Sequence, residues 1–313
     1  MPLTFADETE ELLASAAVDQ KRLLATVYTK YKDIAAKFYN QDYVTLSETD
    51  GLLYIHQNEF AIAYTNDERT LWLGSGDATT CHIVILRQKE TGVTLLSHVD
   101  SSADERMIAR FVSSMRKAVT QFGEYTKPWR FDLWLFGGFT DAKGYSSEIS
   151  SLLLSEFHKA SISIDLQVAC ITKLNTAMRD GQPVPRITGV AICLKSGQVV
   201  PAIFADRGPD LPLRMTSCTE GMRNVYDYER RVMSIQPFLY WPISRADRLL
   251  SMSDEWFLQN LSTSPHCEPA DFVANMRASI QFATDNPNPE KLFNGRPREY
   301  QRNNQTGRWK MID

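Results

Sequence analysis

One cysteine and one histidine stand on neighbouring apolar runs, an arrangement that could support nucleophilic chemistry. Cys81 lies in the run 79–87, and His98 lies in the run 93–99. Both runs are rich in β-branched residues, and residues 88–92 between them have the residue types of a turn. The pattern therefore predicts a β-hairpin that carries both side chains.

The register of this hairpin decides whether the two side chains meet. If Arg87 pairs with Gly92, Cys81 lies directly opposite His98 on the same face, with Cβ atoms about 4.5–5.5 Å apart. A shift of one residue would place the two side chains on opposite faces. Because both runs are apolar on both faces, hydrophobicity alone does not select the register.

A thiol beside an imidazole is a potential nucleophile. A neighbouring imidazolium lowers the pKa of a thiol, and the thiolate is the reactive form. The imidazolium can then protonate a leaving group. The alternative for Cys81 is a small buried side chain, as we expect for Cys170 and Cys193 in their apolar runs. His82 points away from the face of Cys81 and is expected to be structural.

The composition indicates a reducing compartment and excludes several classes of partner. The chain has 313 residues, 43% of them hydrophobic, and five cysteines without disulfide-framework or zinc-ligand spacing. Its net charge of −4, with both signs interspersed, gives no electrostatic footprint for nucleic acid. No apolar run reaches the length of a membrane span, and the first residues do not resemble a signal peptide. We expect a monomer in the cytoplasm, and in the nucleus as a second compartment, with no cofactor, metal, membrane or nucleic-acid partner.

The order of helical and strand patterns is typical of an α+β fold. Helices are predicted at 8–39, 102–122, 146–159, 246–259 and 270–284, the second opened by a capping box from Ser102 to Glu105. Strands are predicted at 51–56, 59–65, 70–74, 129–136, 164–172, 187–195, 198–204, 222–227 and 231–236, with a hairpin turn at 303–307. The strands are not spaced as repeated βαβ units, which argues against Rossmann folds and TIM barrels. We expect an N-terminal helical extension at 1–45 and one catalytic domain at 46–313, with two lobes that could meet in the loop-like segment 175–186.

Several segments together resemble one family. Residues 73–87, Leu-Gly-Ser-Gly-Asp-Ala-Thr-Thr-Cys-His-Ile-Val-Ile-Leu-Arg, resemble the signature of protein N-terminal asparagine amidohydrolases. Further segments resemble that family in the same order, namely 51–54, 137–141, 153–157, 206–209, 226–227, 260–265 and 268–269. The resemblance covers roughly residues 50–313 and is weakest in the opening helical region.

The resemblance carries expectations about fold and catalytic residues. The family's fold is similar to that of the chemoreceptor glutamine deamidase and the cytotoxic necrotizing factor toxins, which are layered α/β/β sandwiches. In the chemoreceptor enzyme a hydroxyl residue six positions before the cysteine orients the histidine, and that position here is Ser75. The resemblance thus implies a triad of Cys81, His98 and Ser75.

The reaction implied is the hydrolysis of an N-terminal asparagine amide to aspartate, with release of ammonia, in an N-degron pathway of protein degradation. Cys81 would attack the side-chain carbonyl carbon, and His98 would protonate the ammonia and then activate water against the thioester. The loop 76–80, including Thr80, would supply backbone N–H groups that, with the Cys81 amide, stabilise the oxyanion. The partners would be proteins or peptides that begin with Asn.

Selectivity for a chain terminus requires recognition of its α-ammonium group. Asparagine and glutamine differ by one methylene, worth only about 1–3 kcal/mol in a fitted pocket. A carboxylate is the natural partner of the ammonium, and the candidates are Glu268, Asp77 and, ranked below them, Asp100. Each also has a structural interpretation: a turn cap for Asp77, a strand end for Asp100, and a helix first turn for Glu268. Tyr54 is a further candidate for the substrate-binding wall, with a core position as its alternative.

Other interpretations of the same residues remain open. One is a deamidase or transglutaminase that acts on glutamine or on internal amides of a folded protein. Another is a non-catalytic adaptor that binds N-terminal segments, and a cysteine protease is a weaker third. The segment at Asp206 and Arg207 is expected to form an ion pair that holds a loop.

Overall fold

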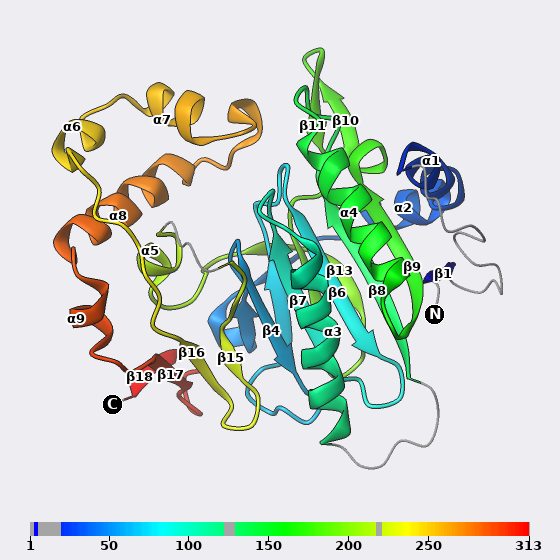
Figure 1. The fold of residues 1–313 in the computed structure, drawn as a ribbon, viewed down its shortest axis with the longest axis horizontal. Coiled ribbons are helices and arrows are strands. Elements are labelled where there is room, and N and C mark those ends of the chain that lie inside the picture. Colours follow the sequence, from blue (N-terminus) through cyan, green and yellow to red (C-terminus); the bar gives the residue numbers. More distant parts are fainter. Residues whose placement is uncertain (1–2, 6–19, 122–128, 217–220, 313) are drawn as a thin grey trace.

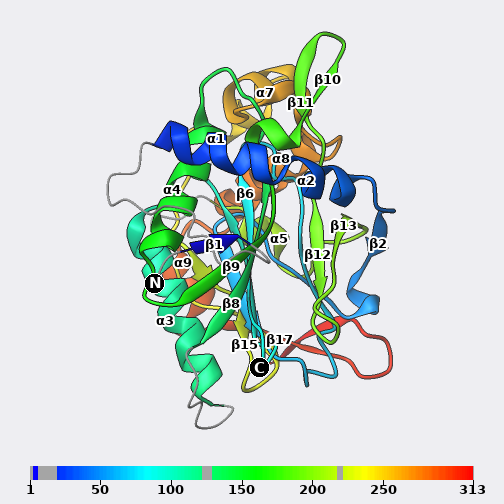
Figure 2. The ribbon, with the colours of Figure 1, turned by 90° about the vertical axis from the view of Figure 1, so that its right-hand side faces the viewer.

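The computed structural model describes residues 3–5, 20–121, 129–216 and 221–312. In this part of the chain two larger β-sheets pack face to face, and helices cover the outer face of the first (Figures 1 and 2). The first sheet has seven described strands in the order β1-β9-β8-β6-β7-β4-β14, and the second has five in the order β2-β13-β12-β5-β3. The arrangement is therefore helix layer, sheet, sheet.

The strands are largely apolar runs that end at turn residues. Those of the first sheet are β1 (Leu3–Phe5), β4 (Glu59–Ala63), β6 (His82–Gln88), β7 (Thr94–Val99), β8 (Arg130–Gly137), β9 (Ser163–Ile171) and β14 (Arg223–Asn224). Those of the second sheet are β2 (Val44–Leu46), β3 (Leu52–Tyr54), β5 (Trp72–Ser75), β12 (Val190–Cys193) and β13 (Val199–Phe204). A core cluster fills the space between the sheets, with Leu73 and Ile192 from one side meeting Ile83, Ile85 and Leu96 from the other.

The helix layer packs on the opposite face of the seven-stranded sheet (Figure 2). It consists of α1 (Gln20–Lys30), α3 (Glu105–Thr120) and α4 (Tyr145–Lys159). The helix after α1, α2 (Lys32–Tyr39), instead buries Ala35 and Phe38 in the core cluster between the sheets. In α3 the buried residues recur at helical spacing, as in Met107, Phe111 and Met115, and they pack on strand residues such as Val84 and Leu95. The sheet is thus apolar on both faces, which explains why its strands lack a simple alternating pattern.

The remaining elements lie beside the sheets. They are η1 (Glu48–Asp50), η2 (Thr172–Asn175), β10 (Thr176–Arg179), β11 (Gln182–Pro185), α5 (Leu211–Arg214), β15 (Tyr226–Asp227), β16 (Val232–Ile235), α6 (Ala246–Leu250), α7 (Asp254–Leu261), η3 (Pro265–Cys267), α8 (Phe272–Asp285), α9 (Pro289–Phe293), β17 (Arg298–Arg302) and β18 (Trp309–Ile312). We call residues 246–285, which hold α6, α7, η3 and α8, the C-terminal arm. It lies to one side of the sheets, in yellow and orange in Figure 1.

The hairpin of β6 and β7 forms as expected, but its register differs from the prediction by two residues. Arg87 pairs with Thr94, not with Gly92, and Ile83 pairs with His98. The longer connection forms because the Gln88 N–H bonds to the Val93 carbonyl and its side chain caps the turn. A shift of two preserves the face of every side chain, since the period of a strand is two. Cys81 and His98 therefore stay on the same side of the sheet, diagonally rather than directly opposed.

Other expected elements have different bounds. The helix predicted at 8–39 is two helices that meet at Tyr31, and its part at 8–19 lies outside the described residues. The N-cap of α3 is Asp104, whose carboxylate accepts from the Met107 N–H, so the capping box at Ser102 was wrong. The helix predicted at 246–259 is broken between α6 and α7, and the loop predicted at 175–186 is largely the hairpin of β10 and β11.

The first part of the chain takes part in both layers. β1 pairs in parallel with β9, and β2 pairs in parallel with β13. Leu3, Leu23 and Tyr31 are buried in the core between the helices and the first sheet. The described residues of the expected extension, 3–5 and 20–45, are therefore integrated in the layered body. Within the described ranges no helix combines the length and apolarity that crossing a membrane requires.

Candidate active site

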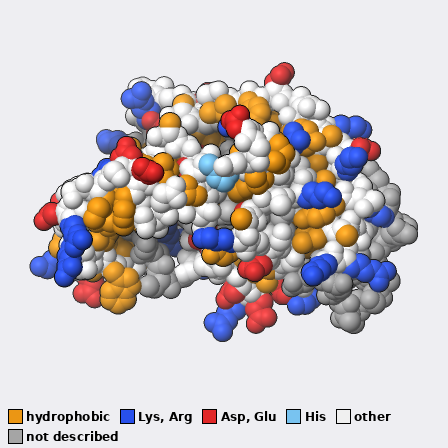
Figure 3. Space-filling model, turned by 90° about the horizontal axis from the view of Figure 1, so that it is seen from above, with side chains coloured by type: hydrophobic (Ala, Val, Ile, Leu, Met, Phe, Trp, Pro, Cys, Tyr) orange, Lys and Arg blue, Asp and Glu red, His pale blue; other side chains and the backbone are white. Residues whose placement is uncertain are grey.

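A cavity of about 910 Å³ opens where the end of the β6–β7 hairpin meets the C-terminal arm. Cys81 and His98 line it together, and Thr80, Asp100 and Glu268 are among the other lining residues. Viewed from above, the surface of the molecule shows acidic, basic and apolar side chains interspersed, without a broad field of one sign (Figure 3). The cavity is large enough to admit the end of a peptide chain as well as one amino acid side chain.

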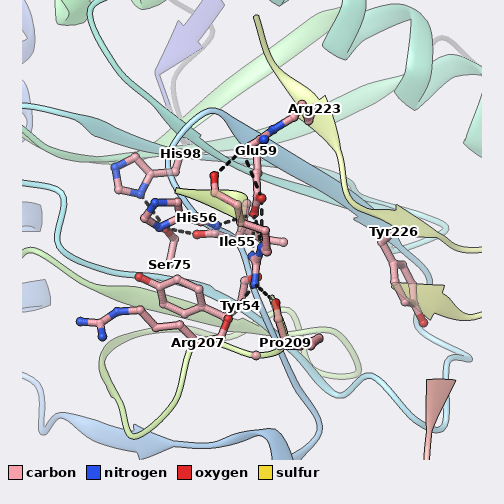
Figure 4. A network of polar contacts seen from close by, with 12 residues as sticks. Tyr54, Ile55, His56, Glu59, Ser75, His98, Arg207, Pro209, Arg223 and Tyr226 are labelled. Carbon is pink, nitrogen blue, oxygen red and sulfur yellow. Dashed lines mark hydrogen bonds and ion pairs between the residues drawn. The ribbon is translucent and has the colours of Figure 1, made fainter. Parts of the chain in front are cut away.

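Ser75 determines the tautomer of His98. Ser75 ends β5 in the second sheet, is fully buried, and donates its single hydroxyl proton to the Ile55 carbonyl at 2.6 Å. Its oxygen also lies 2.8 Å from Nδ1 of His98 (Figure 4). Because the hydroxyl proton is already committed, Nδ1 must be the donor in this second bond. His98 therefore carries its proton on Nδ1 and presents a lone pair on Nε2.

The Nε2 atom of His98 is buried and has no hydrogen-bond partner within the described residues. A buried imidazole nitrogen left without a partner is costly unless it serves a reacting group. Cys81 lies on the same face and borders the same cavity, half-buried, as a free thiol. The pair thus consists of a thiol that can lose a proton and a nitrogen that can accept it.

Two glycines hold the backbone of Cys81 in place. The Cys81 carbonyl accepts from the Gly138 N–H at 2.8 Å. Gly137 and Gly138 have φ angles of +100° and +62°, and a Cβ at Gly137 would collide with the Cys81 carbonyl oxygen. Only glycine allows this approach without strain. The Gly-Gly pair that ends β8 therefore positions the cysteine.

Burial keeps both members of the pair neutral at rest. Desolvation raises the pKa of the Cys81 thiol, and the carboxylates of Asp100 and Glu268 raise it further. Desolvation also lowers the pKa of His98 to about 4. The expectation that an imidazolium lowers the thiol pKa is therefore wrong for this resting site, because the imidazole is too deeply buried to be charged at neutral pH.

The three candidate carboxylates differ in how their charge is compensated. Asp77 binds the guanidinium of Arg207 at 2.8 Å. Asp100 accepts from Gln57, Asn58 and Ser102, and these bonds lower its pKa although burial alone would raise it.

Glu268 is compensated least. Its carboxylate accepts a hydrogen bond from the hydroxyl of Ser262, and it pairs with no basic side chain among the described residues. Burial raises the pKa of Glu268, and the nearby charge of Asp77 raises it further. Of the three, Glu268 is the cavity carboxylate that a bound cation would stabilise most.

The other expected substrate-binding residues have different settings. Thr80 lines the cavity, and its hydroxyl lies 2.8 Å from the hydroxyl of Thr263 in the C-terminal arm. Tyr54 is buried, packs edge-on against Phe204, and does not border the cavity. His82 lies on the opposite face, where its Nε2 bonds to Ser150 of α4 at 2.7 Å, in keeping with a structural role.

Behind His98 lies a buried ion pair that the sequence did not indicate. Arg214 and Glu59 are both inaccessible to solvent and form a two-pronged contact, with Nη2–Oε2 at 2.6 Å and Nε–Oε1 at 3.0 Å. Burial alone would raise the pKa of Glu59, but Arg214 lowers it to about 2. Glu59 also pairs with His98 in the β4–β7 ladder, and its carboxylate accepts from the His56 N–H (Figure 4). The network therefore stiffens the strand end from which His98 projects.

The ion pair expected between Asp206 and Arg207 does not form. Asp206 accepts from the Glu48 N–H, whereas Arg207 reaches Asp77 and Asp271. The resemblance at 206–209 pointed to this loop, but the prediction that Arg207 pairs with Asp206 was wrong. In the described parts of the chain no group of three or more His, Cys, Asp and Glu side chains could hold a metal ion.

Comparisons with known proteins agree on one family. The family model for protein N-terminal asparagine amidohydrolase matches residues 43–311. The proteins of that name from pig and human are 36% and 35% identical to this chain, in each case over 84% of both chains. The protein of that name from Arabidopsis thaliana is 25% identical over 98% of this chain and 97% of its own.

Proposed function

The chain belongs to the protein N-terminal asparagine amidohydrolase family, and we propose that it hydrolyses the side-chain amide of N-terminal asparagine through a thioester on Cys81. The proposal rests on one observation: Cys81 and His98 line the same cavity, and the buried Nε2 of His98 has no hydrogen-bond partner among the described residues. We also propose that the helix–sheet–sheet layering is that of the bacterial glutamine deamidases.

The first half of the reaction forms the thioester. His98 Nε2 accepts the Cys81 thiol proton as the sulfur attacks the amide carbon, so neither group needs to be charged beforehand. The oxyanion accepts from the backbone N–H of Cys81 and from a second N–H in the loop 76–80. The protonated Nε2 then gives its proton to the departing nitrogen, and ammonia leaves.

The second half returns the enzyme to its starting state. Nε2, again neutral, takes a proton from water as the oxygen attacks the thioester carbon. The sulfur departs and recovers the proton from Nε2. The product is an N-terminal aspartate. Throughout, Ser75 holds the Nδ1 proton, which keeps Nε2 free for each transfer.

Glu268 is the proposed partner of the substrate α-ammonium. An ammonium bound there pairs with the carboxylate that, of the three candidates, has the least compensation from hydrogen bonds and basic side chains. It also offsets a negative charge that raises the pKa of Cys81. A free N-terminus therefore makes the thiol easier to deprotonate, whereas an acetylated one does not. This electrostatic link ties recognition of the terminus to activation of the nucleophile.

Mass spectrometry of peptides tests the proposed reaction. Peptides that begin with Asn, Gln or acetyl-Asn, and one with an internal Asn, are incubated with the enzyme. We expect fast change of amide to acid for the free N-terminal Asn peptide, a rate about 10–200-fold lower for the Gln peptide, and none for the acetylated or internal Asn. Equal rates on the acetylated peptide would remove the role of the ammonium. Preferential turnover of glutamine or of the internal amide would support a different deamidase, and binding without any turnover would support an adaptor.

Cysteine substitutions test the nucleophile. Cys81→Ala is expected to keep the fold and to lose all ammonia release, because no other cysteine among the described residues lines the cavity. Cys193→Ala is the matched control, since Cys193 is also half-buried but lies on β12, outside the cavity. Substantial turnover by Cys81→Ala would refute the thioester mechanism.

A further inference from the structure

The C-terminal arm is connected to the catalytic loop by two polar links across the cavity. The first is Arg207, whose Nη2 lies 2.8 Å from Asp77 and whose Nη1 lies 2.5 Å from Asp271. The second is the hydroxyl pair of Thr80 and Thr263 at 2.8 Å. Asp77 and Thr80 belong to the loop that leads into Cys81, whereas Asp271 and Thr263 belong to the arm.

The arm segment between these links carries Glu268. Asp271 is the N-cap residue of α8, three positions after Glu268. Thr263 follows Ser262, whose hydroxyl donates to the Glu268 carboxylate. The two links thus flank Glu268 on either side along the chain. The position of Glu268 relative to Cys81 therefore depends on how rigidly these two links hold the arm.

Arg207 is itself fixed to the body of the protein. Its carbonyl accepts from the buried Arg214 at 2.7 Å, and Tyr54 interacts with its guanidinium. In Figure 4 the Arg207 side chain extends past the Tyr54 ring. Its guanidinium makes two bonds to Asp77 and two to Asp271, and only 17% of the side chain is exposed. A planar guanidinium held in this way is a rigid connector.

Rigidity matters because the substrates to be separated differ little in length. Asparagine and glutamine differ by one methylene, so their amide carbons differ in reach by about one bond, roughly 1.5 Å. If Glu268 binds the ammonium, the spacing from Glu268 to Cys81 decides which amide carbon meets the sulfur. A loosely held arm would accept both lengths.

We infer that Arg207 is a positioning residue that sets the spacing between Glu268 and Cys81, and through it the selectivity for asparagine over glutamine. The inference rests on the proposed function, since it takes Glu268 as the ammonium site. It assigns a role to a side chain that touches neither sulfur nor imidazole. Its partner Asp271 is the point at which the arm can be released with least damage, because its side chain is 46% exposed and caps no N–H of α8.

The test compares Asp271→Ala with Asp254→Ala. Asp254 forms an ion pair with Arg277 at 2.8 Å in the same arm but does not border the cavity, so its loss controls for weakening the arm in general. For each protein kcat/KM is measured on matched Asn- and Gln-peptides. A fitted pocket predicts a wild-type preference for Asn of about 10–200-fold. Asp271→Ala should lower it to within a few-fold of equality, and Asp254→Ala should leave it unchanged.

Two further measurements separate a positioning role from a structural one. The alkylation rate of Cys81 by iodoacetamide should not fall in Asp271→Ala, because the cysteine–histidine pair is intact. In an Asp271→Ala/Glu268→Gln double variant the two losses should not add, since both act at the ammonium. Arg207→Lys, which keeps the charge but not the two-sided contact, should reproduce the loss of selectivity.

The outcomes are distinct. Wild-type turnover of the Asn-peptide tests the proposed function alone. An unchanged Asn-to-Gln ratio in both Asp271→Ala and Arg207→Lys, with the wild type active, would overturn the inference and leave the function standing. The inference would also be overturned if the Asn-to-Gln ratio fell equally in Asp271→Ala and in the control Asp254→Ala.

Discussion

Ser75→Ala is the most direct perturbation of the candidate site, because Ser75 fixes the imidazole without contacting substrate. The substitution removes the donor to the Ile55 carbonyl and the acceptor of His98 Nδ1–H, both buried. A buried polar group left unpaired costs about 1–3 kcal/mol. Two groups lose their partner, so we expect a stability loss of about 2–6 kcal/mol, and the imidazole proton is no longer held on Nδ1 and can move to Nε2.

That proton movement is what harms catalysis. A proton on Nε2 occupies the lone pair that must accept the thiol proton. The hydrogen bond that opposes it has a net value of about 0.5–1.5 kcal/mol, so its loss lowers kcat by about 2- to 12-fold. KM should change little, because the ammonium site at Glu268 is untouched.

Ser97→Ala is the matched control. Ser97 is also fully buried, stands next to His98 on β7, and donates to the Glu59 carbonyl at 3.0 Å. Its side chain points to the opposite face and does not touch the imidazole. Chemical denaturation and steady-state kinetics on an Asn-peptide are measured for both variants. Equal kcat for Ser75→Ala and Ser97→Ala, or a kcat of Ser75→Ala within twofold of wild type, would refute the tautomer argument.

The remaining predictions concern charge and pH. Glu268→Gln should lower kcat/KM by about 10–10²-fold, the value of a charge-assisted hydrogen bond. The same variant should speed alkylation of Cys81, because a negative charge that raises the thiol pKa is gone. Slower or unchanged alkylation, with distant Glu299→Gln as control, would contradict this. On acidification kcat/KM should fall with a midpoint near pH 4 rather than 6.5, since burial lowers the pKa of His98 to about 4 and only the neutral imidazole is a base. A midpoint near 6.5 would show that His98 is not so buried. Stability should decline on acidification from pH 6.5 towards 4, because burial lowers the folded pKa values of His56 and His82 to about 3 and that of His98 to about 4, and the unfolded chain takes up their protons first. Three such groups correspond to about 4.1 kcal/mol per pH unit, so a melting temperature that does not fall between pH 6.5 and 5 would argue against neutral burial of the three histidines.

Local patterns were enough to predict the hairpin, its two reactive side chains and the Gly-Gly break after β8. The strand period of two explains why the prediction survived a wrong register. The pairing of β6 with β7 is shifted by two residues from the predicted one, and any even shift leaves Cys81 and His98 on the same face. The resemblance to a family added Ser75, whose position between two glycines had otherwise suggested an ordinary turn serine.

Tertiary structure alone decided the rest. Ser75 of the second sheet meets His98 of the first, Arg207 meets Asp77 across 130 residues of chain, and Arg214 meets Glu59 across 155. Periodicity reports which face of an element is apolar, but it contains no information on which distant polar groups share that face. The neutral resting state of Cys81 and His98 has the same origin. Their pKa values follow from desolvation by surrounding layers, a property of the packed molecule and not of any short segment.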